Sequence, residues 1–261
     1  MRVSWKLGRV AGIDLFLHPS ALLIFLMTAQ AMPTPLESMA FAVVLLGSVV
    51  LHELGHALMA RRYGIRTEDI TLYLIGGVAR LERMPRSAGP ELLVALAGPA
   101  VNLGIVAALM AVLALPISLP ARFLWNVLAV NAGLALFNLL PIFPMDGGRV
   151  LRALLAGWLG RVRATEIAAT VGRVAAVIGG VFFLRMGMWQ AVLLALFVYM
   201  AAGLERAQVL AEERARLGPR EPDLAGVPAA PLGFRWANRG DGVWRLVPIM
   251  VPGADRGRTW S

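Results

Sequence analysis

The sequence predicts an all-α polytopic membrane protein with about six transmembrane helices and a small membrane-associated β-hairpin or sheet. Three observations lead to this class. Of the 261 residues, 58% are hydrophobic and only 16% are charged, and the mean hydropathy is +0.70, which is far from the balance of a soluble domain. Apolar stretches of about the 20 residues that one span needs recur along the chain. One connecting loop alternates between apolar and polar residues with the period of a strand.

The expected spans lie at residues 19–36, 39–60, 91–115, 122–142, 167–184 and 187–204. Glycine and proline interrupt several of them, which is tolerated where neighbouring helices cover the freed backbone groups. Only a short Arg185–Gly187 segment separates the fifth span from the sixth. This pair is therefore either a tight hairpin or one broken helix.

Basic residues predict the orientation in the membrane. They gather before the first span, between the second and third, after the fourth and after the sixth, whereas the opposite loops carry only Arg122 and Arg185. Because Lys and Arg accumulate on the cytoplasmic side, we expect a multi-pass protein of a prokaryotic cytoplasmic membrane with both termini in the cytoplasm. The net charge of +9 is spread over these short segments rather than along one stripe, so nucleic acid is not an expected partner.

The loop at residues 63–90 holds the strand-like pattern. An alternation from Ile70 to Leu74 is followed by Gly76-Gly77 and by a second alternation from Val78 to Leu81. This pattern predicts a β-hairpin at the membrane surface, and the alternative is an ordinary interhelical connector.

Two regions are expected. Residues 1–204 form one membrane domain, and residues 205–261 form a cytoplasmic tail that we expect to be flexible. The tail begins with a charged amphipathic stretch and continues through a Pro/Gly-rich segment. It then has an Asp-Gly turn between two possible strands.

The candidate chemistry begins with LHELGHALMA in the second span, where Glu53 lies between His52 and His56. Positions i and i+4 share one face of a helix, so both imidazoles can bind one zinc ion while Glu53 serves as general base. Burying ionisable groups in hydrocarbon is costly unless they bind something, which favours a functional site over a structural one.

A catalytic zinc usually has three protein ligands and one open position. The chain has no cysteine, and the remaining histidine, His18 at the membrane edge, is expected to be structural. The third ligand should therefore be a carboxylate, for which Asp146, after the proline-broken end of the fourth span, is the first candidate. Another class of proteins with an HExxH motif takes its third zinc ligand from a glutamate on a later helix. Glu166 and Glu205 are the available candidates for that arrangement.

Three motifs together carry a family resemblance: HELGH in the second span, LAGPAVN in the third and NLLPIFPMDGG at the end of the fourth. Over about residues 1–204 the chain resembles the site-2 protease family of intramembrane zinc metalloproteases, in its compact bacterial or archaeal form. The loops are too short for a PDZ domain and the tail too short for a pair of CBS domains, so we expect neither in this sequence.

The resemblance implies that His52, His56 and Asp146 bind zinc and that Glu53 activates water. It also implies that Asn138 lies near the site and helps to position substrate or the developing oxyanion. Gly76 and Gly77 are implied to border the place where an unwound substrate pairs as an added strand. Asn102, in the third span, is instead expected to make an interhelical hydrogen bond beside Gly98.

The predicted function is hydrolysis of peptide bonds in or near transmembrane segments of membrane proteins, with one zinc ion per chain. The expected partners are a transmembrane protein substrate and the lipid bilayer, and the sequence does not indicate an oligomeric state. The alternative is a polytopic zinc or cation transporter, because intramembrane His and acidic residues also line ion pathways. A transporter usually needs several polar residues along a path, whereas the sequence has one compact cluster.

Overall fold

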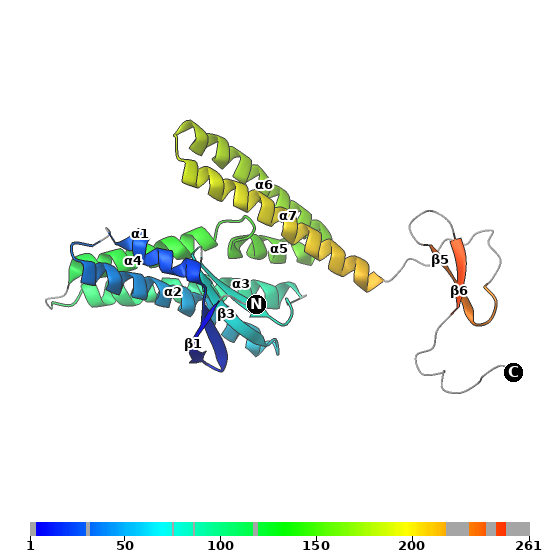
Figure 1. The fold of residues 1–261 in the computed structure, drawn as a ribbon, viewed down its shortest axis with the longest axis horizontal. Helices are drawn as coiled ribbons and strands as arrows, with labels where there is room; N and C mark the ends of the chain where they lie inside the picture. Colours follow the sequence, from blue (N-terminus) through cyan, green and yellow to red (C-terminus); the bar gives the residue numbers. More distant parts are fainter. Residues whose placement is uncertain are drawn as a thin grey trace. The chain divides into compact units, whose positions relative to one another are not determined.

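The computed structural model describes residues 4–29, 32–74, 76–85, 87–116, 120–217, 230–238 and 244–248. The chain divides into two compact units, Met1–Ala211 and Glu212–Ser261. The first unit is mostly helical and carries one small sheet (Figure 1). The helices are η1 Pro19–Leu22, α1 Leu23–Thr28, α2 Pro35–Arg62, α3 Ala88–Leu113, α4 Ala121–Asn138, α5 Asp146–Leu159, α6 Arg161–Arg185 and α7 Trp189–Leu217.

Four helices in the described part of the chain are long and apolar enough to cross a membrane, namely α2, α3, α6 and the Trp189–Glu213 part of α7. In the described part of the expected span at 19–36, the first helical segment covers Pro19–Thr28 and is shorter than predicted. The helix restarts at Pro35, whose missing N–H is tolerated in a first turn, with the Thr34 side chain as N-cap. A new helix therefore begins inside the predicted segment.

The helix α4 has the position predicted for the fourth span but does not reach the apolarity of the other four. Its sequence contains Arg122 and three asparagines, Asn126, Asn131 and Asn138. Amide side chains lower the hydropathy of a helix, and each needs a hydrogen-bond partner when it is buried. One of these asparagines, Asn131, has no exposed surface, so its partners matter for the site described below.

The last two spans are separate helices that form a hairpin. Figure 1 shows α6 and α7 side by side, joined by a turn in which Gly187 has a φ of +71°. The two helices share buried clusters, one with Ala176 and Val198 and one with Ala168 and Ala202. The alternative of one broken helix over residues 167–204 is therefore wrong.

A four-stranded sheet covers one side of α2, with the strand order β1-β2-β3-β4. The predicted hairpin is present as β3 Thr67–Tyr73 and β4 Gly76–Leu81, which pair antiparallel. Two strands, β1 Trp5–Val10 and β2 Ile13–Leu17, were not predicted. β1 pairs antiparallel with β2, and β2 pairs parallel with β3.

The missed strands have a recognisable cause in the sequence. Ile13 and Leu15 alternate with more exposed residues and are buried, and positive φ angles at Ala11 and Gly12 make the tight turn before them. With Ile70 of β3, these side chains form a core against Leu54 and Ala57 of α2. The sheet therefore packs on the stretch of α2 that contains the HExxH motif.

The second unit contains a two-stranded antiparallel sheet of β5 Phe234–Asn238 and β6 Trp244–Pro248. These are the two strands predicted in the tail. The predicted turn at Asp241-Gly242 and the Pro/Gly-rich segment at 218–229 lie outside the described residues. Helix α7 continues to Leu217, beyond the expected end of the membrane domain at residue 204.

Candidate metal centre

The two motif histidines lie on one face of α2, because they are four residues apart on a continuous helix. Both are buried, with 5% of His52 and 7% of His56 exposed. Their Nε2 atoms lie 3.1 Å apart. The helix thus presents two nitrogens to one point inside the protein.

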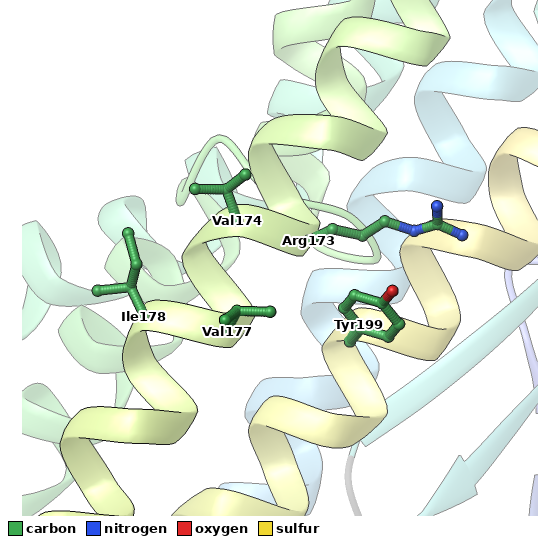
Figure 2. A pocket seen from close by; sticks show the side chains of 5 residues that line it. All are labelled: Arg173, Val174, Val177, Ile178 and Tyr199. Atoms are coloured by element: carbon green, nitrogen blue, oxygen red, sulfur yellow. The ribbon is translucent and has the colours of Figure 1, made fainter.

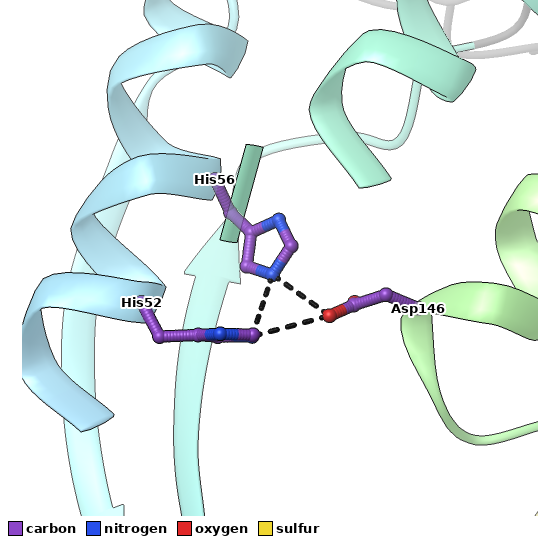
Figure 3. Close-up of side chains that lie close together, drawn as sticks. All are labelled: His52, His56 and Asp146. Carbon is purple, nitrogen blue, oxygen red and sulfur yellow. Dashed lines mark hydrogen bonds and ion pairs between the residues drawn. The ribbon is translucent and has the colours of Figure 1, made fainter. Parts of the chain in front are cut away.

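Asp146 joins them from α5, about ninety positions along the chain. Its Oδ2 lies 3.1 Å from the Nε2 of His52 and 3.1 Å from the Nε2 of His56 (Figure 3). Asp146 is the first residue of α5, and the N-cap is Met145, which makes no side-chain capping bond. At this position an aspartate could cap the helix, but the carboxylate of Asp146 turns toward the imidazoles instead.

One face of α3 orients both histidines. His56 Nδ1 lies 2.7 Å from the backbone carbonyl oxygen of Val94, and His52 Nδ1 lies 2.5 Å from Oδ1 of Asn102. An oxygen of this kind only accepts hydrogen bonds, so each Nδ1 carries the proton and donates it. Each Nε2 is left with a free lone pair directed at the cluster, which is the form in which histidine binds a metal.

A chain of amides determines which way Asn102 faces. Asn131 of α4 donates from Nδ2 to the backbone carbonyl of Val127 at 2.9 Å and to Oγ of Ser48 at 3.1 Å. Its Oδ1 is therefore left to accept from Nδ2 of Asn102 at 2.8 Å, which turns Oδ1 of Asn102 toward His52. Asn102 and Asn131 have no exposed surface, so water does not compete for these groups.

The predicted interhelical hydrogen bond of Asn102 is present, but Asn102 also holds a histidine of the cluster. Asn131 was not among the predicted site residues. The sequence does contain a feature that could have identified Asn131, namely an amide in the middle of an apolar segment, four residues after Val127.

The donor set fits a zinc ion. Ligand atoms of a tetrahedral zinc about 2.0–2.1 Å from the metal lie about 3.3 Å from one another, and the three donors here lie 3.1 Å apart. His52, His56 and Asp146 are the group of side chains in the described residues that could hold a metal ion. Gly98 of α3 keeps room beside them, because a β-carbon there would overlap the Nε2 of His56 and lie 2.7 Å from the Nε2 of His52.

Glu53 follows His52 directly and keeps part of its surface accessible, unlike the two histidines. Strand β4 passes over it at Gly77, where a β-carbon would lie 2.5 Å from Cγ and 3.2 Å from Oε1 of Glu53. Any larger residue at position 77 would require the Glu53 side chain to shift. Of the two glycines, Gly77 thus lies against the predicted base, whereas a β-carbon at Gly76 would meet no atom within 4 Å.

The other sequence candidates lie in separate surroundings. Asn138 ends α4 and donates to the carbonyl oxygen of Leu134 at 2.9 Å. His18 accepts from the backbone N–H of Ser20 as the N-cap of η1. Glu166 pairs with Arg206 at 3.0 Å, and Glu205 pairs with Arg152 at 2.7 Å. Both glutamates thus have cationic partners away from the histidines.

Comparison with known proteins matches this arrangement to one family. The model of "Peptidase family M50" matches residues 40–120 and 115–179, which together span more than half of the chain and include the three donors. The chain belongs to peptidase family M50.

Individual M50 relatives support this membership. A zinc metalloprotease of Methanocaldococcus jannaschii is 38% identical over 218 residues, which cover 81% of this chain and 63% of the relative. A putative zinc metalloprotease of Mycobacterium tuberculosis is 35% identical, covering 82% of this chain and 61% of the relative. A putative zinc metalloprotease of Synechocystis is 30% identical, covering 98% of this chain and 75% of the relative. The chain thus spans about three-fifths of the length of the first two.

A solved structure of the same family shares the fold. The site-2 protease from Methanocaldococcus jannaschii superposes with a TM-score of 0.60 and 36% identity, covering 78% of this chain and 95% of that one. The long apolar helices and this membership make the chain a multi-pass membrane protein.

A second buried polar cluster in this M50 chain was not predicted. Arg152 of α5 is 0% exposed. It donates from Nε to Oε1 of Glu91 at 2.6 Å and from Nη1 to Oε1 of Glu205 at 2.7 Å. Arg161 approaches Oε2 of Glu91 at 3.7 Å. From the sequence, Arg152 and Arg161 were interpreted as topology signals after the fourth span and Glu205 as an alternative zinc ligand, while Glu91 was not singled out.

Proposed function

We propose that this protein is a zinc-dependent intramembrane protease that hydrolyses peptide bonds in or near transmembrane segments of membrane proteins. The observation that carries the proposal is the meeting of His52, His56 and Asp146, with converging lone pairs, between apolar helices. The family and the names of its relatives support peptidase chemistry. Nothing in the comparisons supports the transporter alternative.

In this proposal His52, His56 and Asp146 hold the zinc, which supplies Lewis-acid activation of water and of the scissile carbonyl. Glu53 takes the proton of the attacking water on a carboxylate oxygen and later delivers a proton to the leaving amine. Glu53 is partly exposed rather than fully enclosed, which supports this role. Asn138, at the end of α4 just before the turn into α5, is proposed to help position the substrate or to donate to the developing oxyanion.

The substrate is proposed to bind as an added strand on β4. In the described sheet β4 pairs with β3 and lies at the edge of the strand order, so its outer N–H and C=O groups are available to another strand. A peptide paired there would pass beside Glu53, because Gly77 contacts that side chain. This pairing would satisfy backbone groups that an unwound helix leaves open, which cost several kcal/mol each in lipid.

We further propose six membrane crossings, made by the Pro19–Thr28 region and by α2, α3, α4, α6 and α7, in a prokaryotic cytoplasmic membrane. The cytoplasmic location of both termini is supported by the concentration of arginines on one set of loops. Residues 205–261 are proposed to be a cytoplasmic tail.

The deciding experiment pairs zinc analysis with cleavage of a model single-span substrate by wild type and Glu53→Gln. The variant should bind one zinc per chain and cut no substrate, because the ligands survive while proton removal does not. Glu37→Gln, in the first turn of the same helix, is the matched control and should retain activity. Substantial cleavage by purified Glu53→Gln would show that Glu53 is not the base.

The close approach of β4 to Glu53 has its own test in Gly77→Ala. The added methyl group must push Glu53 aside, and a displacement of about 1 Å can cost about a hundredfold in rate. We expect slower cleavage with full zinc content. Val78→Ala, on the same strand with an exposed side chain, should remain active. If zinc and fold were lost together in Gly77→Ala, the glycine would serve only the turn.

A further inference from the structure

Arg173 is a cation in the middle of a candidate membrane span, α6. Its Nε is buried and has no hydrogen-bond partner. Among the described residues no oxygen accepts a hydrogen bond from its guanidinium or forms an ion pair with it. A guanidinium carries five donors and a full charge, and such a group is costly in a membrane unless it finds an anion or reaches the interface.

The side chain crosses from α6 to α7 rather than pointing into the helical bundle. Its guanidinium lies 5.3 Å from the ring centroid of Tyr199. It also packs on Gly203, where a β-carbon would overlap Nη2. Gly203 is one turn before Arg206, at the arginine-rich end of the hairpin. The Arg173 guanidinium is therefore directed toward the proposed cytoplasmic interface, as expected for a snorkelling arginine.

The neighbouring acid does not neutralise Arg173. Glu166, on the same helix, is paired with Arg206 of α7 at 3.0 Å, and both side chains are about two-fifths exposed. Among Arg173, Arg206 and Glu166, the single carboxylate is thus paired with Arg206, and the positive charge of Arg173 is left uncompensated. The excess positive charge matches an anion at the level of the lipid head groups.

A cavity of about 270 Å³ adjoins the guanidinium, lined by Arg173, Val174, Val177, Ile178 and Tyr199. Figure 2 shows the three aliphatic side chains along α6 and the arginine reaching toward Tyr199 of α7. Val174, Val177 and Ile178 are 52%, 54% and 65% exposed. The site therefore has a cationic end and an apolar wall open to the bilayer.

We propose that this cavity binds a membrane phospholipid through its phosphate group. The Arg173 guanidinium donates to phosphate oxygens, with the Tyr199 hydroxyl as a second donor, and an acyl chain lies along Val174, Val177 and Ile178. A charge-assisted bond between guanidinium and phosphate is among the strongest that a protein forms. The site uses α6 and α7 and none of the three metal donors, so it does not depend on the proposed protease activity.

The test is native mass spectrometry of the purified full chain in detergent, titrated with dioleoylphosphatidylglycerol. We expect wild type to bind one lipid more tightly than the rest, and Arg173→Gln to weaken that step by about tenfold or more. Arg173→Lys should bind at an intermediate level, because an ammonium keeps the charge but not the planar fork. Arg185→Gln is the matched control, an exposed arginine at the other end of α6, and should bind as wild type does.

A second variant, Val177→Trp, fills the cavity while the guanidinium is retained, and it should also weaken the tight step. Excess inorganic phosphate should not displace the lipid, because a free ion gains nothing from the apolar wall. Equal lipid binding by wild type, Arg173→Gln and Val177→Trp would overturn the proposal and leave water as the partner of Arg173. Displacement by inorganic phosphate would overturn it in favour of a simple anion site.

Discussion

Two buried polar clusters lie in the same helical unit, and they differ in how their buried polar and charged groups are compensated. The metal-donor cluster, His52, His56 and Asp146, brings lone pairs to one point with no proton between the three facing atoms. The ion network, Arg152 with Glu91, Glu205 and Arg161, alternates positive and negative groups and neutralises itself. The first needs a cation to be complete, whereas the second is complete within the chain.

Both clusters draw on α3 and α5, which explains how they cooperate. Asp146 begins α5 and Arg152 follows six residues later, while Glu91 and Asn102 both belong to α3. The ion network therefore ties the helix that carries the third donor to the helix that orients the histidines. A comparison of variants in the two clusters should separate loss of metal from loss of fold.

The largest effect is expected for Asp146→Ala, which removes one of three donors. Zinc content should fall well below one per chain and cleavage should be abolished, while the helical content measured by circular dichroism is preserved. Metal analysis by mass spectrometry and the single-span cleavage assay are the measurements.

Glu166→Ala and Glu205→Ala are the matched controls for the third ligand. Each of these glutamates pairs with an arginine instead of approaching the histidines, so both variants should retain stoichiometric zinc. Loss of zinc in either one, with full zinc in Asp146→Ala, would refute the assignment.

The next effect is on stability. Arg152→Met should destabilise the fold by about 3–5 kcal/mol, since removal of one partner leaves buried carboxylates uncompensated. Thermal unfolding of the zinc-free protein in detergent measures this without a contribution from metal binding. The double variant Arg152→Met with Glu91→Gln should recover part of the loss. No recovery would mean that packing rather than charge explains the effect.

A smaller effect is expected for Asn131→Leu, which acts through Asn102 on His52. Loss of outer-shell partners typically weakens metal binding by about 10–100-fold. Zinc affinity, measured by competition with a chelator, should fall within this range while the unfolding midpoint of the zinc-free protein changes little. Asn126→Leu, on the same helix with a contact to Met32 instead, should bind zinc as wild type does. Unchanged affinity in Asn131→Leu would show that His52 needs no such support.

The smallest effect is expected on the sheet, where Asp14 forms a surface cluster with Arg9 and Lys6. The hydrogen bond from Arg9, followed by that from Lys6, lowers the pKa of Asp14 from 3.8 to about 2. A carboxylate with a lowered pKa stabilises the fold at any pH above its pKa in the unfolded chain. This contribution disappears as the pH falls through the pKa of the folded protein. Asp14→Asn should therefore lower the unfolding midpoint slightly at pH 7, by less as the pH falls toward 2, and not at all well below pH 2. An effect as large as that of Arg152→Met would contradict the distinction between exposed and buried pairs.

The parts that sequence reasoning recovered are those with local patterns. Spacing alone places His52 and His56 on one helix face, and the lack of cysteine directs attention to a carboxylate such as Asp146. The alternation of apolar and polar residues in β3 and β4 was also sufficient to predict their hairpin. The short strands β1 and β2 precede the first apolar segment and were missed. β2 joins the sheet by pairing with β3, some fifty residues away in the sequence, and β1 pairs only with β2.

The sequence by itself determined the membrane class, the two histidines with Glu53, and the candidate third ligand, because periodicity and composition act over neighbouring residues. The tertiary structure alone decided that Asn131 supports His52 through Asn102, that Arg152 pairs with Glu91 and Glu205, and that Gly77 contacts Glu53. Each of these contacts joins residues from different elements. Hydrogen bonds and close packing are sensitive to changes in distance of a few tenths of an ångström. Only the packed helices and sheet hold residues so distant in the sequence at the required separation.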